Sequence, residues 1–439
     1  EKIINKYGEI VWFWPNQNRY FWNITEQLDN GDLLGILRNN AWNQSGANGQ
    51  RGVRINIDGN ILFETDFNIQ REFHSHSTID SELTYLTFVK DYFINPLTGL
   101  DIYGDLITEV DNLGNIIFEW NVKDYFAYED VDPNATSNDW THCNAIFFDY
   151  EDSAIYLSCR HLSRITKISY PDGEVIWNMG RQFISEDIDF GDELGLSWQH
   201  AIKKLSNGNL MLFDNGNNDD PELSRGIEFS VNEEEENYSA EIIFEYTLPD
   251  SLFGYKWGDC DQLPNGNMVL TSGPYGAIIE VSPQGELVSS ILNAGGTYRT
   301  ERIDGIHPLA FSILIPNFND NDTINTSYLP VGESITKFEL WNDGDSENIF
   351  NVNIQDELGW MQYNNTITLD SGNSYSIHIP TDVYDTLSDN LITIEVCPLT
   401  SSSSECIYTM LNSRSCSTNP NYNFSDSSEC PELLIGDIN

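Results

Sequence analysis

The sequence predicts an all-β chain, in which a six-bladed β-propeller precedes a small immunoglobulin-like β-sandwich and a short tail. Two observations predict this fold class: a strand–turn–strand unit recurs over the first three quarters of the chain, and the pattern of strands and turns changes after Pro316. Of the 439 residues, 40% are hydrophobic and 12% aromatic, which is enough for more than one packed core.

The repeat is visible in three segments, "ITEQLDNGDLLGIL", "AIKKLSNGNLMLFD" and "DCDQLPNGNMVLTS". Each joins two apolar runs through an Asn-Gly pair, which is a strong hairpin signal. A second strand pair follows each time, of the type "VRINIDGNILFETD", so the unit has four strands. Such units cannot bury their faces alone, and they pack radially as propeller blades.

The predicted inner strands number six and therefore predict six blades. They are residues 22–28, 74–80, 142–148, 198–205, 256–263 and 297–303. The last blade lacks an outer pair, whereas residues 1–14 form an outer pair without an inner strand. We therefore expect residues 1–14 to pair near 297–303 and close a propeller that spans residues 1–314.

Beyond the propeller, residues 315–330 are predicted as a polar linker. Residues 331–412 then alternate between apolar and polar with a period of two, which is typical of an immunoglobulin-like sandwich. Residues 413–439 are predicted as a cysteine-containing tail. Its closing letters, "ELLIGDIN", look like the start of a dockerin-like calcium repeat, so structural calcium is the one metal ion that we expect outside the catalytic site.

The net charge and the cysteines limit the classes of partner and the compartment that we expect. Lys and Arg number 21 against 69 Asp and Glu, a net charge of −48, which argues against nucleic acid as a partner. No apolar run is long enough to insert into a membrane. The seven cysteines lack zinc spacing; we expect disulfides Cys397–Cys406 and Cys416–Cys430, a free Cys260, and Cys143 with Cys159 as either a disulfide or small core residues. Disulfides favour a secreted protein, extracellular or periplasmic.

Polar residues gather at the start of the third predicted inner strand. If the hairpin within residues 137–168 turns about Glu151, His142 opposes Arg160 and Cys143 opposes Cys159. Asn144 lies two positions from His142 and therefore shares its face. His142, Asn144 and Arg160 should thus cluster at one mouth of the inner strands.

Other predicted inner strands carry histidines near their starts. His200 begins one of them, with Asn215 of "FDNGN" expected opposite, and another contains His74 and His76. Imidazole can act as a nucleophile or as an acid and base, and Arg with an amide suits an oxyanion such as sulfate or phosphate. Two alternatives stand beside this interpretation: polar residues that line a wet channel, and a three-histidine zinc site, which the like charge of a nearby Arg disfavours.

Several motifs together resemble the bacterial arylsulfate sulfotransferase family, namely "DWTHCNAI", "YLSCRHLSRITKI", "WQHA", "SRGIEFSV" and "YRTERI". The resemblance spans about residues 1–310. It implies a secreted six-bladed propeller that moves a sulfuryl group from an aryl sulfate donor to a phenolic acceptor. It also implies that no nucleotide donor (PAPS) or other organic cofactor is needed, and that a histidine is transiently sulfated.

The resemblance also implies roles for individual residues. His200 matches the nucleophile, His142, Asn144 and Arg160 match groups that bind the sulfuryl oxygens, and His76 is favoured over His74 as the remaining histidine. Further substrate-binding residues are expected at His74, His161, Asn215 and Arg299, with no metal in the site. The rival hypothesis is a non-catalytic extracellular propeller, a structural protein of a cell surface, an adhesion contact or a filament, with a cell-surface or self-assembly partner on its C-terminal region.

Overall fold

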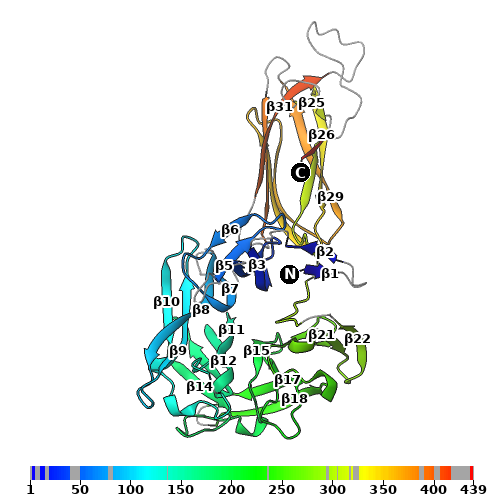
Figure 1. Cartoon of the computed structure of the whole chain (residues 1–439). Coiled ribbons are helices and arrows are strands. Elements are labelled where there is room, and N and C mark those ends of the chain that lie inside the picture. The colour runs from blue at the N-terminus through cyan, green and yellow to red at the C-terminus, as the bar shows by residue number, and fades with distance from the viewer. Residues whose placement is uncertain are drawn as a thin grey trace. The chain divides into compact units, whose positions relative to one another are not determined.

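The computed structural model of the chain describes residues 2–4, 10–14, 19–39, 50–77, 83–135, 137–234, 237–292, 296–303, 305–315, 318–319, 326–384, 390–399, 406–416 and 436–438 (Figure 1). Over these residues the chain forms β-strands and short 3₁₀ helices and no α-helix, which confirms the predicted all-β class. None of these helices has the length and apolar character needed to cross a membrane.

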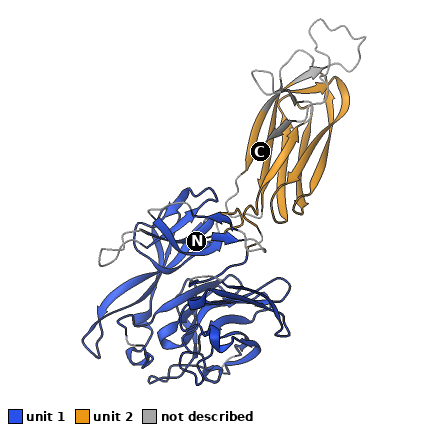
Figure 2. Ribbon diagram, turned by 45° about the vertical axis from the view of Figure 1, so that its right-hand side comes forward, with its two compact units in different colours: residues 1–27, 33–302 blue, residues 28–32, 303–439 orange. Residues whose placement is uncertain are grey.

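The chain divides into two compact units, Glu1–Gln27 with Leu33–Arg302, and Leu28–Asp32 with Ile303–Asn439 (Figure 2). The second unit begins before the predicted propeller boundary at residue 314, because β23 (Phe311–Ile315) pairs with β26 (Gly332–Asn342) of the sandwich. The predicted linker, 315–330, likewise contains β24 (Phe318–Asn319) and β25 (Thr326–Pro330), which pair with each other. Both boundaries are therefore corrected.

The first unit contains five four-stranded antiparallel sheets in its described residues, each a meander in chain order. Their strands are β3 (Arg19–Gln27), β4 (Leu33–Asn39), β5 (Arg51–Ile55) and β6 (Ile61–Glu64); β7 (Gln70–Ser77), β8 (Leu83–Ile94), β9 (Asp101–Val110) and β10 (Ile116–Asn121); β11 (Cys143–Asp149), β12 (Ala154–Cys159), β13 (Arg164–Ser169) and β14 (Val175–Gly180); β15 (His200–Lys204), β16 (Leu210–Asp214), β17 (Arg225–Asn232) and β18 (Ser239–Thr247); and β19 (Asp259–Gln262), β20 (Met268–Ser272), β21 (Ala277–Val281) and β22 (Leu287–Leu292). The 3₁₀ helices are η1 (Val122–Asp124), η2 (Tyr128–Asp130), η3 (Arg160–Leu162), η4 (Asp192–Leu194), η5 (Asp250–Leu252) and η6 (Gly273–Tyr275).

Consecutive sheets pack face to face and bury their apolar residues between them. One core joins Phe88 of β8 to Ile155 of β12, and the next joins Ile165 of β13 to Leu212 of β16. The first strands β7, β11, β15 and β19 lie in succession. Meanders packed in this order are how propeller blades are built.

The sixth blade is not formed as predicted. Within the described part of the chain, β1 (Lys2–Ile4) and β2 (Ile10–Phe13) pair only with each other, and residues 297–303 contain no strand. Instead, the Thr297 amide donates to the Gly273 carbonyl and the Gly258 amide donates to the Tyr298 carbonyl. Because these backbone groups bond the loops around β19, they are not available for a ladder with residues 1–14.

The second unit is a β-sandwich. One sheet has the order β29 (Ser374–Val383), β26, β23 and β32 (Gly436–Ile438), and the other β24, β25, β31 (Ile407–Cys416), β30 (Asn390–Pro398), β27 (Asn348–Asp356) and β28 (Gln362–Leu369). Buried and more exposed residues alternate along strands such as β26 and β30. Phe338 and Ile377 of one sheet meet Phe350 and Ile394 of the other in one core. Residues 413–416 and 436–438, predicted as tail, lie in these sheets.

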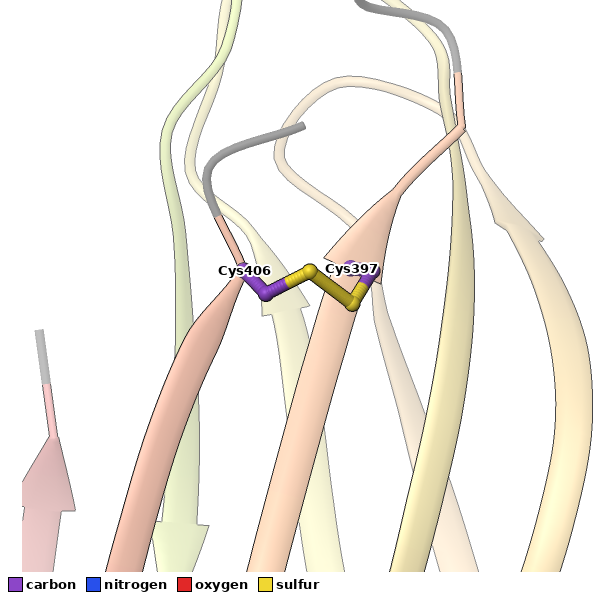
Figure 3. The surroundings of a disulfide bond; sticks show 2 residues. All are labelled: Cys397 and Cys406. Atoms are coloured by element: carbon purple, nitrogen blue, oxygen red, sulfur yellow. A yellow bond between two sulfur atoms is a disulfide. The ribbon is translucent and has the colours of Figure 1, made fainter. Parts of the chain in front are cut away.

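The predicted disulfide Cys397–Cys406 is present and joins the ends of β30 and β31 (Figure 3). Cys143 and Cys159 oppose each other as predicted and are buried free thiols, with 2.7 Å between their Sγ atoms. Cys260 is also free. The predicted Cys416–Cys430 bridge lies outside the described residues, because Cys430 is among those not described.

Candidate active site

A recurring backbone feature marks the starts of the first strands. Arg71, His142, Trp198 and Trp257, at or just before β7, β11, β15 and β19, adopt left-handed backbone conformations with φ of 55°, 48°, 59° and 59°. Each such residue costs roughly 1–3 kcal/mol and persists only where its surroundings impose it, typically at functional sites. The side chains described below gather around these four positions.

His200 is buried and is held in one tautomer. The Asn215 amide nitrogen donates to the carbonyls of Gly254 and Trp257, so its Oδ1 faces His200 and accepts from Nδ1 at 2.6 Å. The proton of His200 therefore sits on Nδ1, and the lone pair on Nε2, for which the described residues supply no hydrogen-bond partner. Burial, followed by the positive charge of Arg160, lowers the pKa of His200 well below its usual value. His200 is thus a neutral imidazole that can act as a nucleophile.

Arg160 is a buried cation without a carboxylate. Its Nη1 donates to His161 Nε2 at 2.9 Å, its Nη2 donates to the Tyr255 carbonyl at 3.2 Å, and its guanidinium lies 3.9 Å from the ring centroid of Trp198. Among the described residues no carboxylate lies within ion-pair distance of it, although the charges of Asp139 and Asp132 act to raise its pKa. Its buried Nε has no partner among the described residues. Burial lowers the pKa of Arg160 to about 10, so it stays charged at neutral pH.

His161 positions Arg160. Its Nδ1 donates to the Asp139 carbonyl at 2.7 Å, which leaves Nε2 to accept from Arg160. Burial, and then the charge of Arg160, lowers the pKa of His161 to about 4. Both ring nitrogens of His161 are therefore occupied, and the ring holds the guanidinium in place rather than reacting.

The His142 ring lies against the His161 ring in a tilted arrangement, with 4.7 Å between ring centroids, and its Nδ1 donates to the Asp139 carboxylate at 2.6 Å. Burial, and then the charge of Arg71, lowers the pKa of His142 to about 4. Its Nε2 has no hydrogen-bond partner among the described residues, and 29% of the side chain is exposed. His142 can therefore exchange a proton with a bound molecule while Asp139 stabilises the charged ring.

Asp139 and Arg71 brace this histidine pair, although neither was predicted from the sequence. Arg71 donates to Asp139 at 3.2 Å and forms an ion pair with Asp105, which in turn accepts from the Cys143 amide at 2.7 Å. Although burial acts to raise it, the pKa of Asp139 is lowered because Arg71 and His142 lie beside it. Asp139 is therefore a carboxylate at neutral pH.

Asn144 and Arg299 connect the sheets. The Asn144 amide nitrogen donates to the Gln199 carbonyl at 2.7 Å, next to His200, and its backbone carbonyl accepts from Arg299 at 2.7 Å. The Asn144 Oδ1 is buried and has no partner among the described residues. Unlike Arg160, Arg299 is paired with a buried carboxylate, that of Glu72.

The two histidines of β7 differ in their surroundings. His74 shares Glu72 with Arg299, at 2.6 Å, and although burial acts to lower it, the pKa of His74 is raised to about 9 by Glu26 and Glu72. His76 bonds Glu109 at 2.7 Å and packs against Phe148. Since four residues of strand span about 13 Å, His76 lies well beyond Glu72, the carboxylate that His74 and Arg299 share.

The structure thus brings most of the predicted site residues together and leaves one out. These residues, which we call the network, form three hydrogen-bonded groups: His200 with Asn215; Asn144 with Arg299, which shares Glu72 with His74; and Arg160 with His161, which shares Asp139 with His142. The charges of Arg160, His142 and Arg299 all act on His200, so the three groups lie close together. In the hairpin of β11 and β12, the predicted register is correct at the open end, where Cys143 pairs with Cys159. Beyond that pair, the observed register differs from the predicted one by one residue. Similarly, His200 pairs with Phe213 rather than Asn215, which reaches it only through its side chain.

The donor set suits an oxyanion better than a metal ion. His161 Nε2 already accepts from a guanidinium, and Arg160 would add like charge beside any cation. Among the described residues, the group spaced closely enough for a metal is Glu395, Cys397 and Cys406, whose sulfurs form the disulfide. A neutral nucleophile and a buried guanidinium can instead attack and hold a tetrahedral anion.

Comparison with known proteins adds one positive finding. The sequence model of the family described as "Arylsulfotransferase (ASST)" matches residues 2–296. No curated protein sequence matches the chain. Similar solved structures include a protein of unknown function from Bacteroides caccae (12% identity, 66% of this chain and 89% of that one, TM-score 0.39) and a catalytically inactive virginiamycin B lyase from Staphylococcus aureus (12% identity, 90% and 96%, TM-score 0.37). Scores this low do not establish a shared fold.

Proposed function

The chain belongs to the arylsulfotransferase family, and we propose that it moves a sulfuryl group from an aryl sulfate to a phenol through a sulfated His200. Family membership supports aryl sulfotransferase activity in general. The finer statement, a covalent histidine intermediate, draws its support from the tautomer and environment of His200.

The observation that carries this proposal is Arg160. A buried guanidinium with no carboxylate in direct contact is costly, because desolvation outweighs the more distant charges of Asp139 and Asp132 and disfavours the charged form. A sulfate ester brings the missing negative charge, and the planar fork of Arg160 can hold two of its oxygens. The protein surface is strongly acidic, so this local cation is what would retain an anionic substrate.

In the first step, the lone pair of His200 Nε2 attacks the sulfur. An N–S bond forms, the S–O bond to the aryl group breaks, and the electron pair leaves with the aryl oxygen as phenolate. Arg160 holds oxygens of the sulfuryl group, and since it is already in place, no reorganisation is needed as charge shifts. The proton on Nδ1 of His200 stays shared with Asn215, which steadies the positive ring.

In the second step, the phenolic oxygen of the acceptor attacks the same sulfur and the N–S bond breaks, returning its electron pair to Nε2. His142 Nε2 takes the proton of the phenol, and the Asp139 carboxylate stabilises the resulting imidazolium. Because the donor and the acceptor are both aryl compounds, no nucleotide is required. The proposal also places the protein outside the cytoplasm, with support from the Cys397–Cys406 disulfide.

The proposal also retains a β-propeller architecture for the first unit and an immunoglobulin-like fold for the sandwich. What supports the first is the succession of packed four-stranded meanders. The sandwich order and its shared core support the second.

The test is an assay with 4-nitrophenyl sulfate as donor and phenol as acceptor. Nitrophenolate should be released in proportion to the phenol supplied, and phenyl sulfate should accumulate in equal amount. Arg160→Lys should fail to support turnover, since Lys keeps the charge but loses the fork. If the wild-type protein releases no nitrophenolate with any phenol, the catalytic proposal is wrong, and a binding scaffold becomes the better interpretation.

A further inference from the structure

A cavity of about 560 Å³ lies next to the network, within the first unit. Aromatic side chains line it, chiefly Phe13, Trp14, Trp22, Trp257 and Tyr298. The rings of Trp22, Trp257 and Tyr298 lie 6.1, 6.2 and 6.3 Å apart in pairs, in edge-to-face or tilted contact. These three rings form an aromatic wall, a surface on which another ring can pack.

The size of the cavity indicates more than one ring. An engineered cavity of about 150 Å³ takes a single benzene. Sites of about 300–1,000 Å³ are typical of larger ligands with several rings. At about 560 Å³, this cavity falls in the second range.

The wall is built around Trp257. A Cβ on Gly273 would lie 2.5 Å from the Trp257 Cβ, and a Cβ on Gly296 would lie 2.8 Å from its Cζ3, so both positions need glycine to leave room for the ring. Trp257 also has a left-handed backbone, with φ of 59°, which an ordinary residue adopts only under constraint. The position of the Trp257 indole therefore requires two glycines and one strained backbone conformation.

The cavity is tied directly to the nucleophile. Asn215, whose Oδ1 holds His200, donates through its amide nitrogen to the Trp257 carbonyl at 2.8 Å. Tyr298 precedes Arg299, which bonds the Asn144 carbonyl. The Tyr298 hydroxyl is buried and has no hydrogen-bond partner among the described residues. A ligand in the cavity would thus lie beside Trp257, whose carbonyl bonds the Asn215 side chain that holds His200.

Three cationic side chains border the aromatic wall, although the whole chain has only 21 Lys and Arg residues. The Arg38 guanidinium lies 3.9 Å from the ring centroid of Trp22, the Lys256 ammonium lies 4.2 Å from that of Trp257, and Lys2 lines the cavity. None of these three forms an ion pair with a described carboxylate, whereas most other cations of this unit do. The cavity therefore favours an aromatic molecule that carries negative charge.

We infer that this cavity binds the ring system of an anionic aromatic molecule with two or more fused or linked rings, and that Trp257 selects it over a single-ring compound. The inference rests on the proposed function, because it places the sulfated or phenolic end of that molecule at His200. It names the substrate class as multi-ring aryl sulfates and phenols.

The experiment uses sulfonates, whose carbon–sulfur bond cannot be broken by this displacement, so binding is measured without turnover. Calorimetry on the full chain gives dissociation constants for naphthalene-2-sulfonate and benzenesulfonate. We expect the two-ring probe to bind about five- to tenfold more tightly, the effect of one added aromatic contact. In Trp257→Gly, which suits the left-handed backbone, this preference should vanish while the Kd of benzenesulfonate stays within about twofold.

The control is Tyr92→Ala, which removes an exposed aromatic ring of the same unit that does not line the cavity, and which should keep the wild-type preference. Trp22→Leu provides a second cavity variant should Trp257→Gly not fold, and it should also lose the preference. Equal affinity for both probes in the wild type, or a preference that survives both cavity variants, would overturn the inference even in an active enzyme. Conversely, a protein that shows the preference but transfers no sulfuryl group would overturn the proposed function and leave the aromatic site standing.

Discussion

Replacing Arg160 separates a catalytic role from a structural one, because the catalytic role predicts an almost unchanged stability and the structural role predicts a large loss of stability. The pKa of Arg160 falls from 12.5 to about 10 on burial. At pH 7 the group is charged in both the folded and the unfolded chain, so keeping it charged in the fold costs about 3 kcal/mol. This cost is present at every pH below about 10, and it is relieved as the pH rises through 10 towards 12.5.

Arg160→Met removes this cost and keeps an apolar stem against Trp198. It also loses the cation–π contact and the bonds to His161 and Tyr255, each worth about 1 kcal/mol. The losses and the gain nearly cancel, so the free energy of unfolding should stay within about 1 kcal/mol of the wild-type value.

Activity should behave differently. Loss of one preorganised donor to a developing oxyanion lowers kcat by roughly 10²–10³-fold. We expect Arg160→Met to lose at least this much turnover of 4-nitrophenyl sulfate while urea unfolding, followed by tryptophan fluorescence, is unchanged. Full activity in this variant would refute the assignment. A loss of 3 kcal/mol or more in stability, in parallel with activity, would show that Arg160 is a structural residue.

Three further predictions concern the surroundings of the site. His76→Ala should leave kcat within about twofold of wild type, yet destabilise the fold by about 1–3 kcal/mol because buried Glu109 loses a partner; a collapse of kcat in a folded variant would return His76 to the site. The pKa values of His142 and His161 are about 4 in the folded chain, below the 6.5 of the unfolded chain, so the unfolded chain binds more protons. The free energy of unfolding should therefore fall by about 3 kcal/mol per histidine as the pH drops from 6.5 to 4. Urea midpoints that do not move over this pH range in the wild type, or that move as much in His142→Gln, would contradict this prediction. Replacing Cys397 and Cys406 by Ser should destabilise the sandwich by about 2–3 kcal/mol, from the loss of a short closed loop, without changing turnover; peptide mapping of the unreduced wild type that finds both thiols free would remove the premise.

The parts of the fold that the sequence predicted are those with local signals. Asn-Gly turns between apolar runs located hairpins such as β15–β16 and β19–β20, because the turn residues and the period of two act over a few positions. The disulfide of β30 and β31 was also local, because its cysteines are only nine positions apart in the sequence. The predicted strand at 297–303 failed because its backbone partners are Gly258 and Gly273, which no short-range pattern reveals.

The sequence pointed to the histidines, Arg160 and Asn144 of the candidate site, but not to the residues that hold them in place. Histidines are rare in this chain, so their recurrence at strand starts was informative. Asp139 and Glu72 stand in the same short motifs, but nothing in their spacing marks them among 69 acidic residues as buried partners. In the same way, nothing marks Arg71 among the 21 basic residues. The separation of His76 from His74 also depends on packing: both face the same side of β7, and only the bond to Glu109 and the contact with Phe148 place His76 elsewhere.

The most direct test of the central claim is covalent. Wild-type protein is mixed with 4-nitrophenyl sulfate without acceptor, quenched at alkaline pH where a sulfated imidazole survives, and digested for mass spectrometry. We expect a burst of one nitrophenolate per chain and a sulfuryl group on the peptide that contains His200. Both should be absent from His200→Ala, and the sulfuryl group should leave the wild-type protein when phenol is added. Sulfation on His142 or His76 instead, or turnover in His200→Ala, would contradict it.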